Sequence, residues 1–215
     1  MELQNCVHKC RLNPSELGRG NCMSATGIDK ILILSHDRSK NKAVESLIVQ
    51  GLKHPHAIVE ALFDDNGMRE VRKGDYGLLI LITPLDNDKA FRACRDCIKH
   101  PTATMILITD DPDDDQSLAK KERYLDIGVC ILHRPVSRSA FLVALKSADT
   151  AHIRLCTLNK KVEEEKVIAR SKIILVKTLS LTEDEAHKFI EKEAMNSGQT
   201  KLEVAMEIIR TYDYL

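Results

Sequence analysis

Residues 76–84 read YGLLILITP, and this stretch decides the fold. Its apolar side chains follow one another without alternating with polar ones, which is typical of a strand buried on both faces. Four more short apolar runs, each bounded by polar residues, occur at residues 30–34, 56–61, 102–109 and 129–135. Strands of this kind need helices above and below the sheet, because both of their faces must be kept from water.

Segments with helical spacing of apolar residues lie between these runs. They cover residues 39–52, 66–74, 89–100, 117–128 and 137–148. Five short strands that alternate with five helices predict right-handed βαβ units and a parallel sheet covered on both faces. The predicted fold class is therefore α/β.

Length and composition limit the possibilities further. The 215 residues, 43% of them apolar, suit one ordinary domain plus a small one. Lys plus Arg and Asp plus Glu number 32 each, so any nucleic-acid binding must come from a local patch. No apolar run reaches the length of a membrane span, and the N-terminus lacks the apolar centre of a secretory signal. We expect a cytoplasmic protein without membrane contact, and we expect residues 1–28 to be a flexible extension.

The sequence after the last predicted strand is helical throughout. Apolar residues recur there at intervals of three and four, starting at Ala148, which is typical of a coiled-coil seam of about two heptads. We predict a linker helix over residues 148–165 that forms a homodimer. The alternative is a helix that packs on its own domain. The predicted seam consists of Ala151, Leu155, Leu158 and Val162.

Two capping boxes punctuate the C-terminal region. Thr182 with Glu185 is expected to begin one helix, Thr200 with Glu203 the next, and Gly198 suits the helix end between them. Together with the end of the preceding long helix, these segments predict a small three-helix module over residues 160–215. A unit of this size is marginally stable alone and gains from its long helix.

Two resemblances follow from these segments. Residues 29–147 resemble the receiver domain of bacterial response regulators, which implies a flavodoxin-like five-stranded parallel sheet. Residues 160–215 resemble the ANTAR module, an RNA-binding antitermination domain. The motifs that carry the second resemblance are ARSKIIL (169–175), LTEDEAHKFI (181–190) and EAMNSGQTKLEVAMEII (193–209). The chain is thus similar to an ANTAR-family response regulator of a two-component system.

The receiver-like part departs from the usual phosphorylation site. Phosphoryl transfer to a carboxylate needs that carboxylate and a metal that stabilises the developing charge. An apolar residue occupies the phosphoacceptor position, and only one acidic residue follows the first strand. We therefore expect a pseudo-receiver that is not phosphorylated at the usual site and answers to a partner protein or another signal. The positions concerned are Ser35, His36, Asp37, Ile82, Thr109 and Arg134.

The ANTAR resemblance implies a transcription antiterminator that binds stem-loop RNA in nascent leader transcripts. We consider two alternatives. The first is a DNA-binding response regulator, which short acidic terminal helices disfavour. The second is a dimeric protein-binding adaptor without nucleic-acid activity. The implied RNA-binding residues are Lys172, first of all, and then Arg170, Lys177, Gln199, Thr200 and Lys201.

Other polar clusters are better explained as structure than as chemistry. Cys94 and Cys97 have the spacing of a redox pair but fall inside a predicted helix. The spacing of Cys6, His8, Cys10 and Cys22 matches no familiar zinc finger. The acidic stretch at residues 110–115 lacks the pattern of a calcium loop and is interpreted as a solvated loop. We expect no enzymatic activity, cofactor or metal.

Overall fold

The computed structural model describes residues 27–212, apart from residues 38, 40, 113, 115 and 116. The predicted alternation of strands and helices is confirmed. The candidate zinc ligands Cys6, His8, Cys10 and Cys22 lie outside the described residues. The elements are β1 (Lys30–Ser35), α1 (Asn41–Gly51), β2 (Ala57–Leu62), α2 (Asp65–Lys73), β3 (Leu78–Ile82), α3 (Asp88–Cys97), β4 (Thr104–Thr109), α4 (Leu118–Leu125), β5 (Val129–His133), α5 (Arg138–Leu179), α6 (Glu183–Ser197) and α7 (Lys201–Tyr212).

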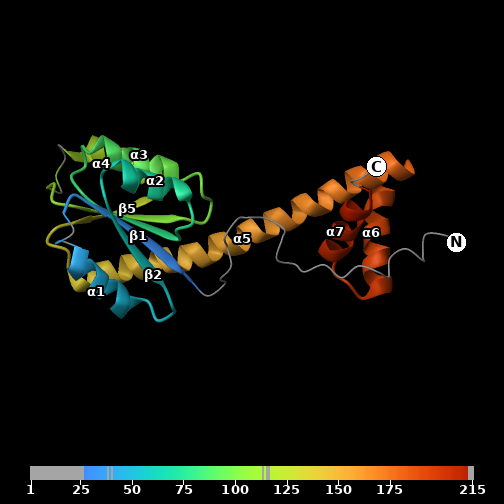
Figure 1. The fold of residues 1–215 in the computed structure, drawn as a ribbon, viewed down its shortest axis with the longest axis horizontal. Coiled ribbons are helices and arrows are strands. Elements are labelled where there is room, and N and C mark those ends of the chain that lie inside the picture. The colour runs from blue at the N-terminus through green and yellow to red at the C-terminus, as the bar shows by residue number, and fades with distance from the viewer. Residues whose placement is uncertain (1–26, 38, 40, 113, 115–116, 213–215) are drawn as a thin grey trace.

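The five strands form one parallel sheet in the order β2-β1-β3-β4-β5. This is the doubly wound, flavodoxin-like order that the receiver resemblance implies. β3, the stretch that decided the fold, lies at the centre of the sheet, and all five of its residues are buried. Figure 1 shows α2, α3 and α4 on one face of the sheet and α1 with the start of α5 on the other.

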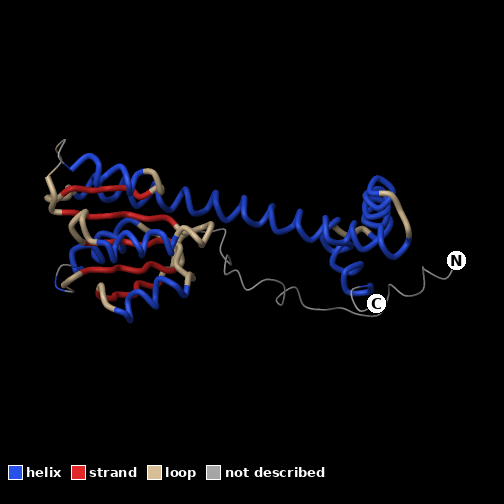
Figure 2. Tube along the Cα trace, turned by 90° about the horizontal axis from the view of Figure 1, so that it is seen from above, coloured by secondary structure: helices blue, strands red, loops and turns tan. Residues whose placement is uncertain are grey.

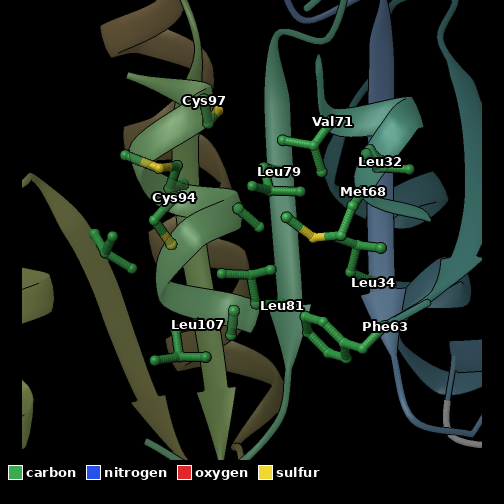
Figure 3. Packing of buried hydrophobic residues seen from close by; sticks show 14 of the residues in the cluster. Leu32, Leu34, Phe63, Met68, Val71, Leu79, Leu81, Cys94, Cys97 and Leu107 are labelled. Atoms are coloured by element: carbon green, nitrogen blue, oxygen red, sulfur yellow. The ribbon is translucent and has the colours of Figure 1, made fainter. Parts of the chain in front are cut away.

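The strand side chains divide between two cores because successive residues point to opposite faces. Leu79 and Leu81 of β3 pack with residues of α2 and α3, including Met68 and Cys94, as Figure 3 shows. On the other face, Ile80 joins a cluster that includes residues of α1 and α5. Because helices cover both faces of the sheet, a central strand such as β3 needs apolar residues at every position.

α5 is a single helix of 42 residues that belongs to both halves of the molecule. Its first turns pack on the sheet and its last turns pack against α6 and α7, so it spans the distance between the two halves in Figure 2. The predicted linker is thus the middle of one helix. Ala148 packs in the sheet-domain core rather than in a seam, and is only 9% exposed. No helix of the described chain is both long and apolar enough to cross a membrane.

The buried carboxylate of Asp149 in α5 contacts the beginning of the described chain. Asp149 accepts hydrogen bonds from the backbone N–H of Ile28 at 3.1 Å and from Lys146 at 3.2 Å, and its carboxylate lies 3.0 Å from Nε2 of His54. Ile28 is fully buried in the core with α1 and α5. The ordered domain therefore includes Ile28, which the sequence analysis had assigned to the flexible extension.

The C-terminal module has a small core of its own, formed where α5, α6 and α7 meet. Both predicted capping boxes are present, with Thr182 paired to Glu185 and Thr200 paired to Glu203. Gly198 ends α6 in the left-handed conformation, with φ of 67°, as predicted. The buried residues of this core are Leu175, Ala186, Ile190, Ala194, Val204 and Ile208.

Candidate functional site

The carboxyl ends of the parallel strands meet at one edge of the sheet, where doubly wound folds hold their sites. β1, β3 and β4 end there at Ser35, Ile82 and Thr109. Ser35 is fully buried, and Ile82 is 5% exposed. The Ile82 side chain supplies no nucleophile at this edge.

His36 takes part in a hydrogen-bonded cluster at this edge. Its Nε2 lies 3.1 Å from the hydroxyl of Thr83 and 3.1 Å from the amide nitrogen of Asn87. That amide also donates to the Thr83 hydroxyl at 2.8 Å. The imidazole also lies against the ring of Phe63, with the ring centroids 5.0 Å apart and the ring planes tilted by 39°. His36 therefore connects the β1–α1 loop to the β3–α3 loop.

The carboxylate of Asp111 links the β3–α3 loop to the β4–α4 loop. Asp111 accepts hydrogen bonds from the backbone N–H of Leu85 at 2.5 Å and from the hydroxyl of Thr109 at 2.7 Å. Burial opposes ionisation of Asp111, but these two bonds, together with the charges of Lys120 and His133, outweigh it and hold its pKa below the usual range. Asp111 is thus a structural acceptor, whereas Asp110, Pro112 and Asp114 of the same stretch are exposed.

Asp37 and Arg134, two further positions of the expected phosphorylation site, make contacts with nearby residues. Asp37 accepts from the backbone N–H of Ser39 at 2.8 Å and from its hydroxyl at 2.6 Å. Arg134 lies 3.4 Å from the carboxylate of Asp110. Within the described part of the chain, no group of three or more His, Cys, Asp or Glu side chains is placed to hold a metal ion.

Cys94 and Cys97 both lie in α3 and are buried. Burial raises the pKa of each thiol to about 12, and for Cys94 the neighbouring Cys97 adds to the effect. Both thiols are therefore protonated at neutral pH, and a protonated buried thiol is a poor nucleophile. These cysteines serve as core residues.

Two of the implied RNA-binding lysines are engaged in ion pairs within the C-terminal module. Lys172 of α5 lies 3.0 Å from Glu183, the first residue of α6. Lys201, the first residue of α7, lies 2.5 Å from Glu191 of α6. The Lys201 ammonium, through this hydrogen bond and its charge, lowers the pKa of Glu191. Glu191 therefore stays ionised at neutral pH.

The polar residues between α6 and α7 are also bonded to glutamates. The amide of Gln199 donates to Glu207 at 2.9 Å. The backbone N–H and hydroxyl of Thr200 bond to Glu203 at 2.8 Å and 2.9 Å. Thr200 thus caps the start of α7, and this structural role is separate from the RNA-binding role that the ANTAR resemblance implies.

The implied RNA-binding residues lie in separate places. Arg170 and Lys177 are seven residues apart and share an exposed face of α5. Gln199, Thr200 and Lys201 lie at the α6–α7 connection, which Figure 1 shows at the end of the module remote from α5. Lys177 makes no ion pair with any residue that the structure describes. The structure therefore brings together two groups of these side chains rather than one.

An apolar stripe is exposed along the middle of α5. Leu158 is 58% exposed and Val162 is 51% exposed, while Ala151 is exposed and Leu155 is partly buried. At helical spacing the same stripe continues into the C-terminal module through Ala169 and further exposed apolar residues, Ile173 and Val176. The stripe is thus longer than the seam that the sequence predicted.

Comparison with known proteins adds independent observations. Residues 157–209 match the ANTAR domain family. No curated protein matches the chain significantly.

Several solved structures resemble the N-terminal part. A CheY-like response regulator receiver domain protein from Methanospirillum hungatei has 17% identity and a TM-score of 0.45, with 62% of this chain and 98% of that chain covered. A signal receiver domain of an HD domain-containing protein from Pseudomonas fluorescens has 20% identity and a TM-score of 0.45, with 59% and 97% covered. A two-component transcriptional regulator AraC from Clostridium phytofermentans has 16% identity and a TM-score of 0.46, with 59% and 95% covered.

The receiver fold is assigned from the strand order β2-β1-β3-β4-β5 and from helices on both faces of the sheet. The C-terminal assignment comes from the family match over residues 157–209, which contain the second half of α5, all of α6 and most of α7. The chain therefore joins a domain with the receiver fold to a segment that matches the ANTAR domain family, and one continuous helix, α5, runs through both.

Proposed function

We propose that the protein is a signal-controlled transcription antiterminator that binds stem-loop RNA in nascent leader transcripts. The ANTAR domain at residues 157–209 is the observation that carries this proposal. Binding of the transcript by this domain would keep a terminator hairpin from forming. The overall charge of zero means that the ANTAR domain must bind RNA through local groups.

The described surface offers two sets of such groups. Arg170 and Lys177 present cations along α5, where they suit the phosphates of an RNA stem. At the other end of the module, Gln199 and Lys201 flank the α6–α7 connection, where Met195 is 83% exposed. Unstacked loop bases are the usual targets of sequence-specific RNA recognition, and an apolar side chain beside hydrogen-bonding groups suits them.

A second copy of the chain is the occupant that we propose for the exposed stripe on α5. A helix that leaves a compact domain must bury its apolar face, and Leu158 and Val162 have no cover from the sheet-domain core or the module core. A homodimer would present two ANTAR domains to a pair of stem-loops. Linking two binding events in this way raises the apparent affinity through effective concentration.

The receiver-like domain would control this activity without phosphorylation at the usual site. Ile82 replaces the phosphoacceptor, and the surrounding loops are held by His36 and Asp111. A regulatory partner protein that binds the receiver-like domain could act through α5, because that helix is shared by both domains. A change in its packing on the sheet would be carried directly into the ANTAR domain.

The proposal is tested by offering the purified protein two pools of equal length, stem-loop RNAs with randomised loops and duplex DNA. We expect selection of a subset of RNA stem-loops, and weaker binding after Lys177→Glu. Lys53→Glu in the receiver-like domain is the matched control and should leave RNA binding unchanged. Preference for duplex DNA would indicate a DNA-binding regulator. Binding of neither pool by a dimeric protein would indicate a protein-binding adaptor.

A further inference from the structure

Four polar side chains of the module are each bonded to one of its glutamates: Lys172 of α5, and Gln199, Thr200 and Lys201 at the α6–α7 connection. We propose that these carboxylates form a screen that weakens the binding of generic nucleic acid and leaves only a shape-matched RNA able to bind. The inference rests on the proposed function for the class of RNA, but the screen itself can be measured with any polyanion. The four pairs are Lys172–Glu183, Lys201–Glu191, Gln199–Glu207 and Thr200–Glu203.

The pair between α5 and α6 shows how the screen works. The side chain of Lys172 is 23% exposed, whereas that of Glu183 is 78% exposed. The carboxylate is therefore the more accessible partner and lies 3.0 Å from the ammonium. A phosphate that approaches Lys172 meets a like charge first, and must either displace Glu183 or remain at a distance.

The pair at the other end of the module has the same character. Glu191 accepts from Lys201, and the same oxygen lies 3.3 Å from Nε2 of His187. One carboxylate thus occupies the position that a phosphate would take between two nitrogen groups. Because Glu191 lies on α6 and Lys201 on α7, the pair spans the two helices that a bound stem-loop would contact.

Stability gives little reason for the two ion pairs, Lys172–Glu183 and Lys201–Glu191, since exposed ion pairs contribute little to folding. Their effect on an approaching anion is larger, because each retained carboxylate cancels the charge that would attract a phosphate. A generic duplex gains no compensating contact. A stem-loop that fits the module makes base and backbone contacts that offset the cost of displacing the carboxylates. The screening carboxylates therefore raise specificity for such an RNA.

The test is the affinity of the full chain for random-sequence duplex DNA over a salt series. The variant Glu183→Gln with Glu191→Gln removes two screening charges. The control, Glu165→Gln with Glu193→Gln, removes two charges whose carboxylates form no ion pair with the described residues. Circular dichroism and the melting temperature confirm that both variants fold like the wild type.

We expect the screen variant to bind duplex DNA about 3- to 10-fold more tightly than the control, since two nearby repulsive charges are gone. The slope of log K against log salt should steepen by up to about 2, since each added phosphate contact contributes about 0.9. Equal affinities and slopes for the two variants would overturn the screen. A wild-type protein that never prefers stem-loop RNA would instead contradict the proposed function, and the DNA comparison would still decide on the screen.

Discussion

Truncation of one buried side chain tests whether the ANTAR domain folds on its own core. Ile190 is fully buried where α5, α6 and α7 meet. Ile190→Ala removes three carbon atoms, each worth about 0.8 kcal/mol of burial, and the remaining cavity adds a further penalty. We expect a loss of about 2–5 kcal/mol. A module of roughly 50 residues has only about 3–8 kcal/mol of stability, so most of it is at risk.

Hydrogen exchange measured by mass spectrometry reports this loss helix by helix. A loss of about 2.7 kcal/mol corresponds to roughly 100-fold faster exchange where the amides open together. We expect that acceleration in α6 and α7, and unchanged protection in β1 and β3. Ile33→Ala is the matched control, because Ile33 is equally buried but lies in the core between the sheet, α1 and α5. It should accelerate exchange in the sheet. Equal acceleration in both domains after Ile190→Ala would refute the separation of the two cores.

Four shorter predictions concern other parts of the molecule. Burial opposes ionisation of Asp149, but its hydrogen bonds from Ile28, Lys146 and His54 outweigh it and lower its pKa. The Asp149 carboxylate therefore stabilises the folded protein at pH values above its ordinary unfolded pKa of 3.8. That contribution is lost as the pH falls further through the folded pKa. Below about pH 4, the free energy of unfolding measured in urea should fall more steeply with decreasing pH in the wild type than in Asp149→Asn. Iodoacetamide at pH 8 should modify exposed Cys130 well before Cys94 and Cys97, as peptide mapping would show, and equal rates would contradict their burial. Leu158→Glu should convert a dimer to a monomer by light scattering, whereas Thr157→Glu, at a neighbouring exposed position, should not. Ile82→Asp should take no phosphoryl group from acetyl phosphate by intact-mass analysis, because Asp37, in the loop after β1, bonds to Ser39 and is preceded by Ser35 and His36 rather than by a second carboxylate.

Local patterns were sufficient to predict most of the elements. β3 was predicted because five consecutive apolar residues can be buried only with helices on both faces. The two capping boxes were predicted because the bonds of a capping box join residues three apart. Each of these features depends on residues that are near neighbours in the sequence.

The contacts that define the candidate sites were not predictable in this way. Asp111 accepts from Leu85, 26 residues away, and His36 meets Asn87 across 51 residues. Both contacts arise only when the strand ends are brought to one edge of the sheet. Thr83 directly follows β3 and Asn87 caps α3 at the end of the same loop, and that placement was the available signal for them. The long helix after β5 was predicted from the absence of helix-breaking residues, and α5 runs without a break through the boundaries drawn between the receiver-like domain, the linker and the module.

The central claim is that this chain acts on RNA in the cell, and crosslinking in the cells that produce it tests this claim most directly. The RNA crosslinked to the wild type would be sequenced beside that from Lys172→Glu with Lys201→Glu. We predict that the wild type enriches transcript leaders with paired stem-loops ahead of a terminator, and that the double variant loses this enrichment while keeping its level in the cell. Identical RNA profiles from the two proteins, or no enriched RNA from the wild type, would contradict the account.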